Sequence, residues 1–469
     1  MTGPMAWAGR GRGAGRGRGG SVGGGGGRDG GRDGGRVSGG RGGGRDAGRS
    51  GSGGPQKRMR DVRDDELGEA HDGFEVDDAF ASDKVGNLRN EKFEQYYQAQ
   101  GIVPDSEWQL MLSSFQTPLP LTFRVNMSGK FRESTKRKLI DTLFPEVIKH
   151  NIARMKPPKC LKWYPDSLAW QIDVPKDALK GNVKLQNLRN FIVRANEVGA
   201  VTRQEAVSMI PPLLLDVKAH HRVLDMCAAP GSKTFQLLEM LHVATSTSNS
   251  NSCCVPSGVV VANDASLQRA NLLTHQTKRS NSPALLVTNH QAQLFPFLLD
   301  RGGDGVQDDT DDPHKFSSKN KNVYRFHRIL CDVPCSGDGT LRKSPDLWKK
   351  WTPASGVELH SLQLAIATHA ARLLKVGGRL VYSTCSLNPL ENESVVSALL
   401  KRGKGALVLA DVSKALPGLE RRPGMHHWRV GDVFGWHDEP GGREPVRKQK
   451  GMAGTALVLS QIRHTMFYL

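Results

Sequence analysis

From about residue 205 onward, short apolar runs alternate with longer amphipathic runs. The apolar runs predict five strands, at residues 221–227, 258–265, 284–290, 327–335 and 377–385. The amphipathic runs predict helices at 231–242, 267–279 and 357–374, the last with a stripe formed by Leu359, Leu362, Ile366 and Leu373. Strands that alternate with helices form a parallel sheet. We therefore expect an α/β domain whose strands all end at one edge, where such sheets bind ligands.

A different pattern occupies residues 86–200. Helices are predicted at 90–100 and 135–152, and strands at 119–126 and 168–174. This mixture indicates a smaller α/β domain ahead of the main one. The predicted domains are therefore a tail (1–80), the smaller domain (86–200) and the main domain (205–469).

The tail contains almost nothing that a folded core could use. Residues 1 to about 54 are mostly glycine, arginine and aspartate, so they cannot offset the entropy cost of ordering. We predict that the tail is disordered. Two other polar stretches, 244–258 and 300–322, interrupt the main domain and are predicted to be surface insertions.

The net positive charge of the chain indicates a polyanionic partner. The formal net charge is +18; ten arginines and three aspartates give residues 1–54 a charge of +7, which leaves +11 on residues 55–469. A basic folded part favours nucleic acid as the partner and a membrane surface as second choice. Arginine–glycine spacing suits loose RNA binding, although a solubilising tail has the same composition. The basic run at 56–60 is a candidate nuclear or nucleolar address, with the cytoplasm as the alternative location.

The seven cysteines include no CxxC pair, so we expect reduced thiols in an intracellular protein and no disulfide scaffold. The first residues lack the apolar region of a secretory signal. No run of about 18 apolar residues predicts a membrane span.

The segment "LDMCAAPGSKT", which starts at Leu224, joins a predicted strand to a predicted helix through small residues. A helix N-terminus at such a junction can receive negative charge. The glycine spacing of a P-loop fails here and GxGxxG is absent, so the pattern favours another type of nucleoside-cofactor loop. Asp264 ends the next strand, where a carboxylate can bind ribose hydroxyls. An ordinary tight turn is the alternative interpretation.

Two cysteines end neighbouring predicted strands. Cys335 follows Asp332 and Pro334, and Cys385 follows the last strand, so both thiols are expected at the ligand edge with Lys233. A zinc site is disfavoured because alternate strand residues face opposite sides; its candidate ligands are Cys227, Cys331, Cys335 and Cys385. Core packing is the usual role of one cysteine alone, but two at one edge favour chemistry. The residues by themselves do not show which thiol attacks.

These segments carry a family resemblance. "LDMCAAPGSKT", "DVPCSGDGT" and "YSTCSLNPLENE" resemble successive motifs of the NSun family of RNA cytosine-5 methyltransferases. "KFEQYYQ", "SLAWQ", "RQEAVSMIPPLLL", "LQLAIA" and "IRHTMF" resemble its eukaryotic tRNA branch. The likeness covers about 88–469.

The resemblance implies a Rossmann-like class I S-adenosylmethionine-dependent methyltransferase domain behind an RNA-binding α/β domain. It implies 5-methylcytosine formation in RNA, above all in tRNA. By resemblance Cys385 is the nucleophile, Cys335 assists product release, and Lys233 and Asp332 complete the catalytic set. The cofactor-binding residues implied are Cys227, Ala228, Ala229, Pro230, Gly231, Ser232, Lys233, Asp264, Gln291 and Asp332.

One position departs from the family. Gln291 stands where the family usually has aspartate, so the expected acceptor for the adenine amino group is uncharged, and we expect weaker cofactor binding. The branch often carries a long C-terminal extension that this sequence does not contain. Ribosomal or messenger RNA is the alternative substrate, and a non-catalytic RNA-binding scaffold is the alternative class. DNA cytosine methyltransferases share only a cysteine after a proline.

Overall fold

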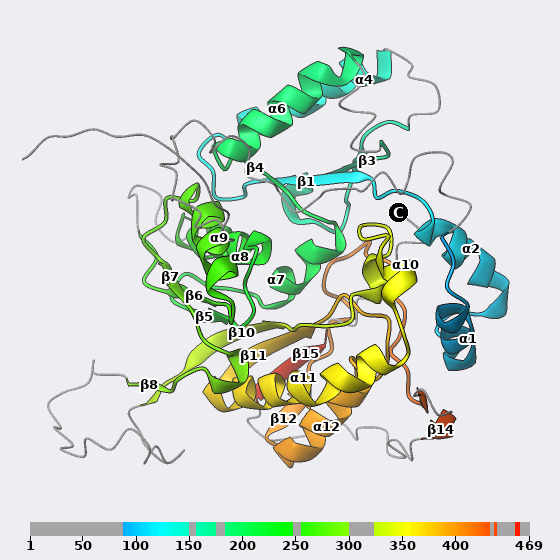
Figure 1. Cartoon of the computed structure of the whole chain (residues 1–469). Coiled ribbons are helices and arrows are strands. Elements are labelled where there is room, and N and C mark those ends of the chain that lie inside the picture. The colour runs from blue at the N-terminus through cyan, green and yellow to red at the C-terminus, as the bar shows by residue number, and fades with distance from the viewer. Residues whose placement is uncertain are drawn as a thin grey trace, which may run out of the picture. The chain divides into compact units, whose positions relative to one another are not determined.

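The computed structural model describes residues 88–149, 156–174, 183–246, 255–299, 323–431, 436–438 and 455–459. These residues belong to one compact unit, His71–Leu469 (Figure 1). The predicted disordered tail, the basic run at 56–60 and most of both predicted insertions lie outside the described residues. In the described part of the chain, no helix is long and apolar enough to cross a membrane.

The main sheet has seven strands in the order β12-β15-β11-β10-β5-β6-β7, and every neighbouring pair is parallel. Its strands are β5 (Arg222–Asp225), β6 (Val259–Asn263), β7 (Leu285–Thr288), β10 (Phe326–Asp332), β11 (Leu374–Ser383), β12 (Leu407–Leu409) and β15 (Thr455–Leu459). The five predicted strands and their parallel arrangement are confirmed, whereas β12 and β15 were not predicted. The strand order reverses between β5 and β10, and such a switch point opens a crevice at the carboxyl edge.

Both faces of this sheet are buried, as expected for a parallel sheet. Val223 and Val381 face one hydrophobic cluster, while their neighbours Leu224 and Tyr382 face another. This alternation follows from the two-residue period of a strand. Because both faces are buried, successive residues of each strand are apolar, and this produces the continuous apolar runs in the sequence.

Helices cover the two faces of the main sheet (Figure 1). The long ones are α8 (Ser232–Ser246), α9 (Leu267–Lys278), α11 (Ala354–Leu373) and α12 (Glu393–Gly403). The three predicted helices are confirmed. The insertion predicted from residue 244 was wrong for its first three residues, because α8 continues through Ser246.

The buried face of α11 differs from the predicted stripe. Ile366 and Leu373 are buried as predicted, but Leu359 and Leu362 are only half-buried. The buried face also contains Gln363, which has a polar partner at the site described below. A stripe chosen from apolar residues alone missed this position.

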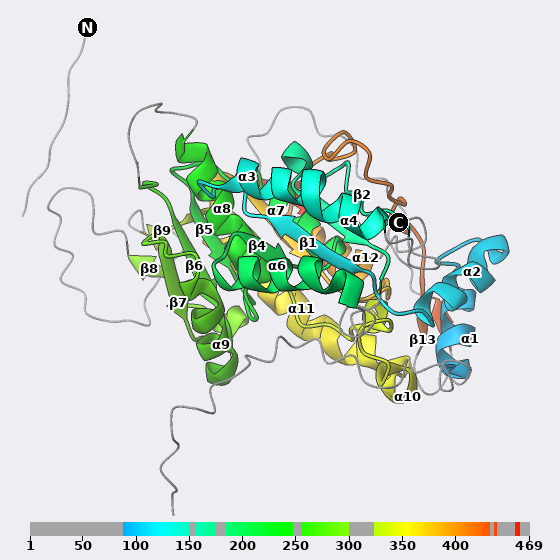
Figure 2. The same ribbon diagram turned by 90° about the horizontal axis from the view of Figure 1, so that it is seen from above.

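A second, four-stranded antiparallel sheet has the order β2-β3-β1-β4. Its strands are β1 (Leu121–Val125), β2 (Lys159–Cys160), β3 (Ala169–Ile172) and β4 (Val201–Arg203). Helix α6 (Gln186–Glu197) lies over it (Figures 1 and 2). The predicted strands at 119–126 and 168–174 are confirmed, and the boundary predicted between the two domains stays a prediction.

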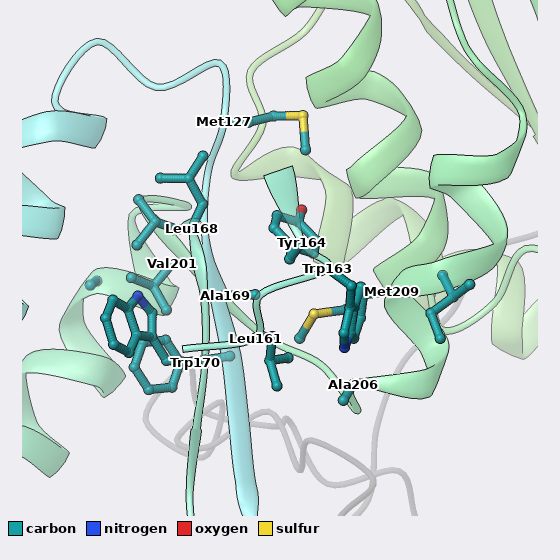
Figure 3. Close-up of a cluster of buried hydrophobic side chains, with 14 of the residues drawn as sticks. Met127, Leu161, Trp163, Tyr164, Leu168, Ala169, Trp170, Val201, Ala206 and Met209 are labelled. Carbon is teal, nitrogen blue, oxygen red and sulfur yellow. The ribbon is translucent and has the colours of Figure 1, made fainter. Parts of the chain in front are cut away.

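The helix predicted at 135–152 is interrupted. It consists of α3 (Arg132–Arg137), a π-helical stretch (Lys138–Leu143) and α4 (Phe144–Lys149), and the structure describes it only as far as residue 149. The hydrophobic cluster between the two sheets includes Met127, Trp163 and Met209 (Figure 3). One continuous core therefore reaches from the second sheet to the main sheet.

The first two helices, α1 (Glu91–Gln100) and α2 (Asp105–Phe115), pack against the loops that follow β10 and β11. Asn90 begins α1: its side chain accepts from the Phe93 amide and donates to the carbonyl of Trp348. Other short elements connect the rest: η5 (Pro165–Ser167), η6 (Val183–Leu185), η7 (Val207–Met209), α7 (Ile210–Leu214), η8 (Ala292–Leu294), β8 (Leu298–Leu299), β9 (Val323–Tyr324), η9 (Asp338–Thr340), α10 (Leu347–Lys350), β13 (Arg429–Gly431) and β14 (Trp436–Asp438).

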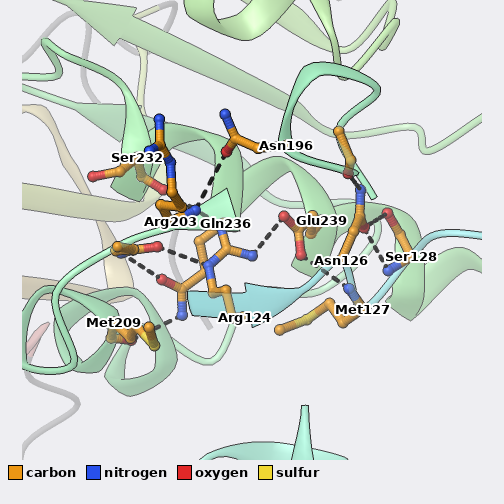
Figure 4. Close-up of polar contacts among 12 residues, drawn as sticks. Arg124, Asn126, Met127, Ser128, Asn196, Arg203, Met209, Ser232, Gln236 and Glu239 are labelled. Atoms are coloured by element: carbon orange, nitrogen blue, oxygen red, sulfur yellow. Dashed lines mark hydrogen bonds and ion pairs between the residues drawn. The ribbon is translucent and has the colours of Figure 1, made fainter. Parts of the chain in front are cut away.

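A buried ion pair ties the second sheet to α8. Arg124 of β1 lies 2.6 Å from the carboxylate of Glu239, and their side chains are 0% and 3% exposed (Figure 4). Arg124 also donates to Gln204, and Glu239 accepts from the amide of Met127. Burial raises the pKa of Glu239 against the effect of Arg124, so the pair depends on both partners.

We predict that Glu239→Gln lowers the free energy of unfolding by about 3–5 kcal/mol, because it leaves the Arg124 guanidinium buried without a counter-charge. Asp346→Asn is the matched control. It breaks the exposed pair with Lys350, which is expected to contribute less than about 1 kcal/mol. Urea unfolding of the full chain measures both, and equal small losses would contradict the role given to Glu239.

Candidate active site

The parallel register of β10 and β11 brings the two predicted cysteines together. Asp332 lies opposite Ser383 at the ends of these strands. In the loops that follow, the sulfur atoms of Cys335 and Cys385 are 3.0 Å apart, and the amide of Cys385 donates to the Cys335 sulfur. Both side chains are half-buried. The two thiols therefore share one site.

Lys233 and Asp332 form an ion pair beside them. The distance from Lys233 Nζ to Asp332 Oδ2 is 2.8 Å, and the hydroxyl of Ser383 donates to Asp332 Oδ1 at 2.7 Å. Burial lowers the pKa of Lys233, but the interaction with Asp332 outweighs it, and the net shift is upward. Lys233 is therefore a permanent cation at neutral pH. Because Asp332 is 29% exposed, its carboxylate remains reachable by a ligand.

The two thiols are not equivalent. The hydrogen bond with Cys385, together with burial, raises the pKa of Cys335 well above its ordinary value. Cys335 is therefore a neutral thiol that can donate to the Cys385 sulfur. Lys233 also interacts electrostatically with Cys385. These contacts place a hydrogen-bond donor and a cation beside the Cys385 sulfur.

The loop from Cys227 to Ser232 lies against the end of β6. The amide of Ala228 donates to the carbonyl of Asn263 at 2.7 Å, and the amide of Ala229 donates to Asp264 at 3.1 Å. Gly231 has a φ of +110°, and a Cβ there would lie 2.7 Å from Leu273. Only glycine avoids both the left-handed strain and this close approach.

Two buried carboxylates, Asp225 and Asp264, lie beside this loop. Asp225, at the end of β5, keeps one buried carboxylate oxygen without a hydrogen-bond partner, and burial raises its pKa to about 7. Asp264 is 3% exposed, and its oxygens accept from Ala229 and Ser266. Asp225 was not predicted, although its orphaned oxygen is the clearest sign that a polar ligand belongs beside this loop.

Gln291 lies outside this hydrogen-bonded loop. Its side chain is exposed, and its carbonyl oxygen accepts from Gln293 at 2.8 Å, just before η8. Its predicted contact with adenine stays a prediction. Among the described residues, no group of three or more histidine, cysteine or acidic side chains is arranged to hold a metal ion.

Sequence reasoning missed the buried carboxylate of Asp338. Its side chain accepts from the amide of Leu387 at 2.7 Å, from Trp351 Nε1 at 3.1 Å and from the hydroxyl of Tyr97. Burial and the nearby Glu391 raise its pKa to about 6. Asp338 thus joins both cysteine loops to α1. The only sequence signal was an acidic residue inside an otherwise small-residue motif.

Comparisons with known proteins identify the class. Residues 212–416 match the family model described as 16S rRNA methyltransferase RsmB/F. This match confirms the methyltransferase resemblance for these residues. S-adenosylmethionine is the cofactor of such domains.

Individual relatives are named for a more specific activity than the family model. The chain is 45% identical over 369 residues to the multisite-specific tRNA:(cytosine-C(5))-methyltransferase of Saccharomyces cerevisiae, which covers 78% of this chain and 49% of that protein. It is 45% identical over 352 residues to the tRNA (cytosine(34)-C(5))-methyltransferase of Drosophila melanogaster, covering 73% and 44%. The chain thus spans about half the length of these curated relatives. A solved methyltransferase homologue from Pyrococcus horikoshii aligns at 23% identity with a TM-score of 0.43, covering 68% of this chain and 81% of that one.

Gln291→Asp is predicted to tighten S-adenosylmethionine binding about fivefold, because a charged acceptor adds about 1 kcal/mol to a hydrogen bond. Isothermal titration calorimetry measures this. Gln293→Asp is the matched control, since it places the same charge two residues away and is expected to leave the affinity unchanged. Unchanged affinity in Gln291→Asp would remove the predicted adenine contact.

Proposed function

We propose that this protein transfers the methyl group of S-adenosylmethionine to carbon 5 of a cytosine in RNA, with tRNA as the substrate. The observation that carries the proposal is the pair of sulfur atoms of Cys335 and Cys385, 3.0 Å apart beside the Lys233–Asp332 ion pair. A single core cysteine would need none of these partners. Two adjacent thiols suit a reaction that forms and then breaks a covalent bond.

In the first step the sulfur of Cys385 attacks carbon 6 of the cytosine. Carbon 5 is a poor nucleophile, and the new bond pushes electron density onto it. The cofactor supplies an electrophilic methyl group for carbon 5. Asp332 can accept a hydrogen bond from the N4 amino group of the base and so orient it, and Lys233 holds that carboxylate in place.

The second step returns the enzyme to its starting state. Carbon 5 loses its proton, the bond between carbon 6 and the Cys385 sulfur breaks, and the double bond of the ring forms again. Cys335 is the group that we assign to assist this step. Its sulfur lies 3.0 Å from the Cys385 sulfur, so its thiol is placed to donate a proton to that sulfur as the bond to carbon 6 breaks.

The tRNA assignment is supported by the relatives from yeast and fly, which are tRNA cytosine methyltransferases and align with most of this chain. A cytosine inside a helix cannot reach a half-buried thiol, so the target base must be unpaired or flipped. The charge of +11 on residues 55–469 supports RNA as the polyanion. The family model is named for 16S rRNA enzymes, which keeps rRNA as the competing substrate.

Methyl transfer from radiolabelled S-adenosylmethionine to separate pools of tRNA, rRNA and mRNA tests the proposal. We expect label in 5-methylcytidine after digestion of the tRNA pool. Label in rRNA alone would show that rRNA, and not tRNA, is the substrate. RNA binding without any transfer would leave a non-catalytic scaffold and overturn the proposed activity.

The two thiols are predicted to fail in different ways. Cys335→Ala should accumulate a covalent RNA–protein band on a denaturing gel, with turnover lowered by about 10²–10⁴-fold. Cys385→Ala should form no band because no sulfur attacks. Cys331→Ala, which removes a third thiol buried in the core under β10, is the control and should behave like the unchanged protein. A band from Cys385→Ala but not from Cys335→Ala would exchange the two roles.

A further inference from the structure

Glu391 is a fully buried carboxylate just before α12. Four donors converge on it: the amide of Ser336 at 2.8 Å, the hydroxyls of Ser336 and Ser386 at 2.5 Å each, and Gln363 Nε2 at 2.9 Å. A buried carboxylate is costly unless hydrogen bonds offset its lost hydration. These four bonds therefore fix the groups that donate them.

The donors are neighbours of the two thiols. Ser336 follows Cys335 in the chain, and Ser386 follows Cys385. One carboxylate therefore holds both cysteine loops, although they lie 50 residues apart in sequence. Gln363 adds the end of β10 to the same network, because its amide also donates to the carbonyl of Pro334 at 2.9 Å.

A second carboxylate, in the Cys335 loop, binds the Cys385 loop. Asp338, in the Cys335 loop, accepts from the amide of Leu387 in the Cys385 loop at 2.7 Å. Glu391 lies beyond the Cys385 loop and accepts from Ser336 in the Cys335 loop. The loops are also joined directly, because the amide of Gly339 donates to the carbonyl of Cys385 at 2.9 Å and the Ser336 hydroxyl donates to that of Ser386 at 3.1 Å. Glu391 is the carboxylate that accepts from the residue following each cysteine.

We propose that Glu391 is a positioning residue that sets the separation of the Cys335 and Cys385 sulfurs. Its importance for catalysis rests on the proposed function, in which both thiols serve one cytosine in turn. If the loops separate, Cys385 can still attack, but Cys335 no longer reaches the adduct. A misplacement of about 1 Å at such a site can cost about 10²-fold in rate.

The first test needs no RNA. Diamide takes one hydrogen from each of two neighbouring thiols and is reduced to a hydrazine as their disulfide forms. Sulfurs 3.0 Å apart need little movement to reach the roughly 2.0 Å of a disulfide bond. Peptide mass spectrometry of the full chain then measures the rate at which Cys335 and Cys385 become linked.

Glu391→Ala is expected to slow this linkage at least tenfold, and Glu391→Gln to recover part of it, because the amide keeps one acceptor oxygen. Glu393→Ala is the matched control. Glu393 is also buried in this segment but accepts from the amide of Met425, so its loss should leave the linkage rate within twofold. If Glu391→Ala does not fold, Ser336→Ala with Ser386→Ala removes the two hydroxyl contacts and keeps the Glu391 side chain with its bonds from the Ser336 amide and Gln363; this variant is also expected to slow the linkage.

The second readout is methyl transfer. Glu391→Ala should lower kcat about 100-fold with little change in KM for RNA, and a covalent band should accumulate, since release is impaired more than attack. A folded Glu391 variant that forms the disulfide at the unchanged rate would overturn the inference. Normal linkage in the unchanged protein without any methyl transfer would instead overturn the proposed function and leave the positioning role standing.

Discussion

The parallel register between β10 and β11 is the constraint on which the site depends. Because Asp332 lies opposite Ser383, the loops carrying the two cysteines leave the sheet side by side. A shift by one residue would turn each following side chain to the other face of the sheet. The Lys233 contact depends on the register between β10 and its other neighbour, β5, which leads into the loop before α8.

This arrangement requires buried charge, and the structure offsets that charge locally. Asp338 and Glu391 accept hydrogen bonds from both cysteine loops, and Asp338 also accepts from Tyr97 of α1. The N-terminal helices are therefore part of the site's support. The Arg124–Glu239 pair does the same between the second sheet and α8, beside a hydrogen bond from Gln204 to Gln236.

The sequence predicted the five central strands and the meeting of Cys335 with Cys385, because both follow from a local two-residue period and from parallel connection. It did not predict β12 or β15, which are short or far along the chain. It also gave no role to Glu391. Nothing local distinguishes a surface glutamate from one that becomes buried when Gln363 and Ser336 reach it from other elements. Whether such a polar residue becomes buried and which groups it binds depend on tertiary contacts.

The central claim is that two neighbouring thiols have different jobs and that Cys385 is the one that bonds to the base. The most direct measurement uses tRNA containing 5-fluorocytidine, in which fluorine at carbon 5 replaces the proton that must leave and so traps the adduct. After nuclease and protease digestion, mass spectrometry locates the modified peptide. The account predicts the methylated nucleotide on Cys385. The nucleotide on Cys335, or on no cysteine, would contradict it.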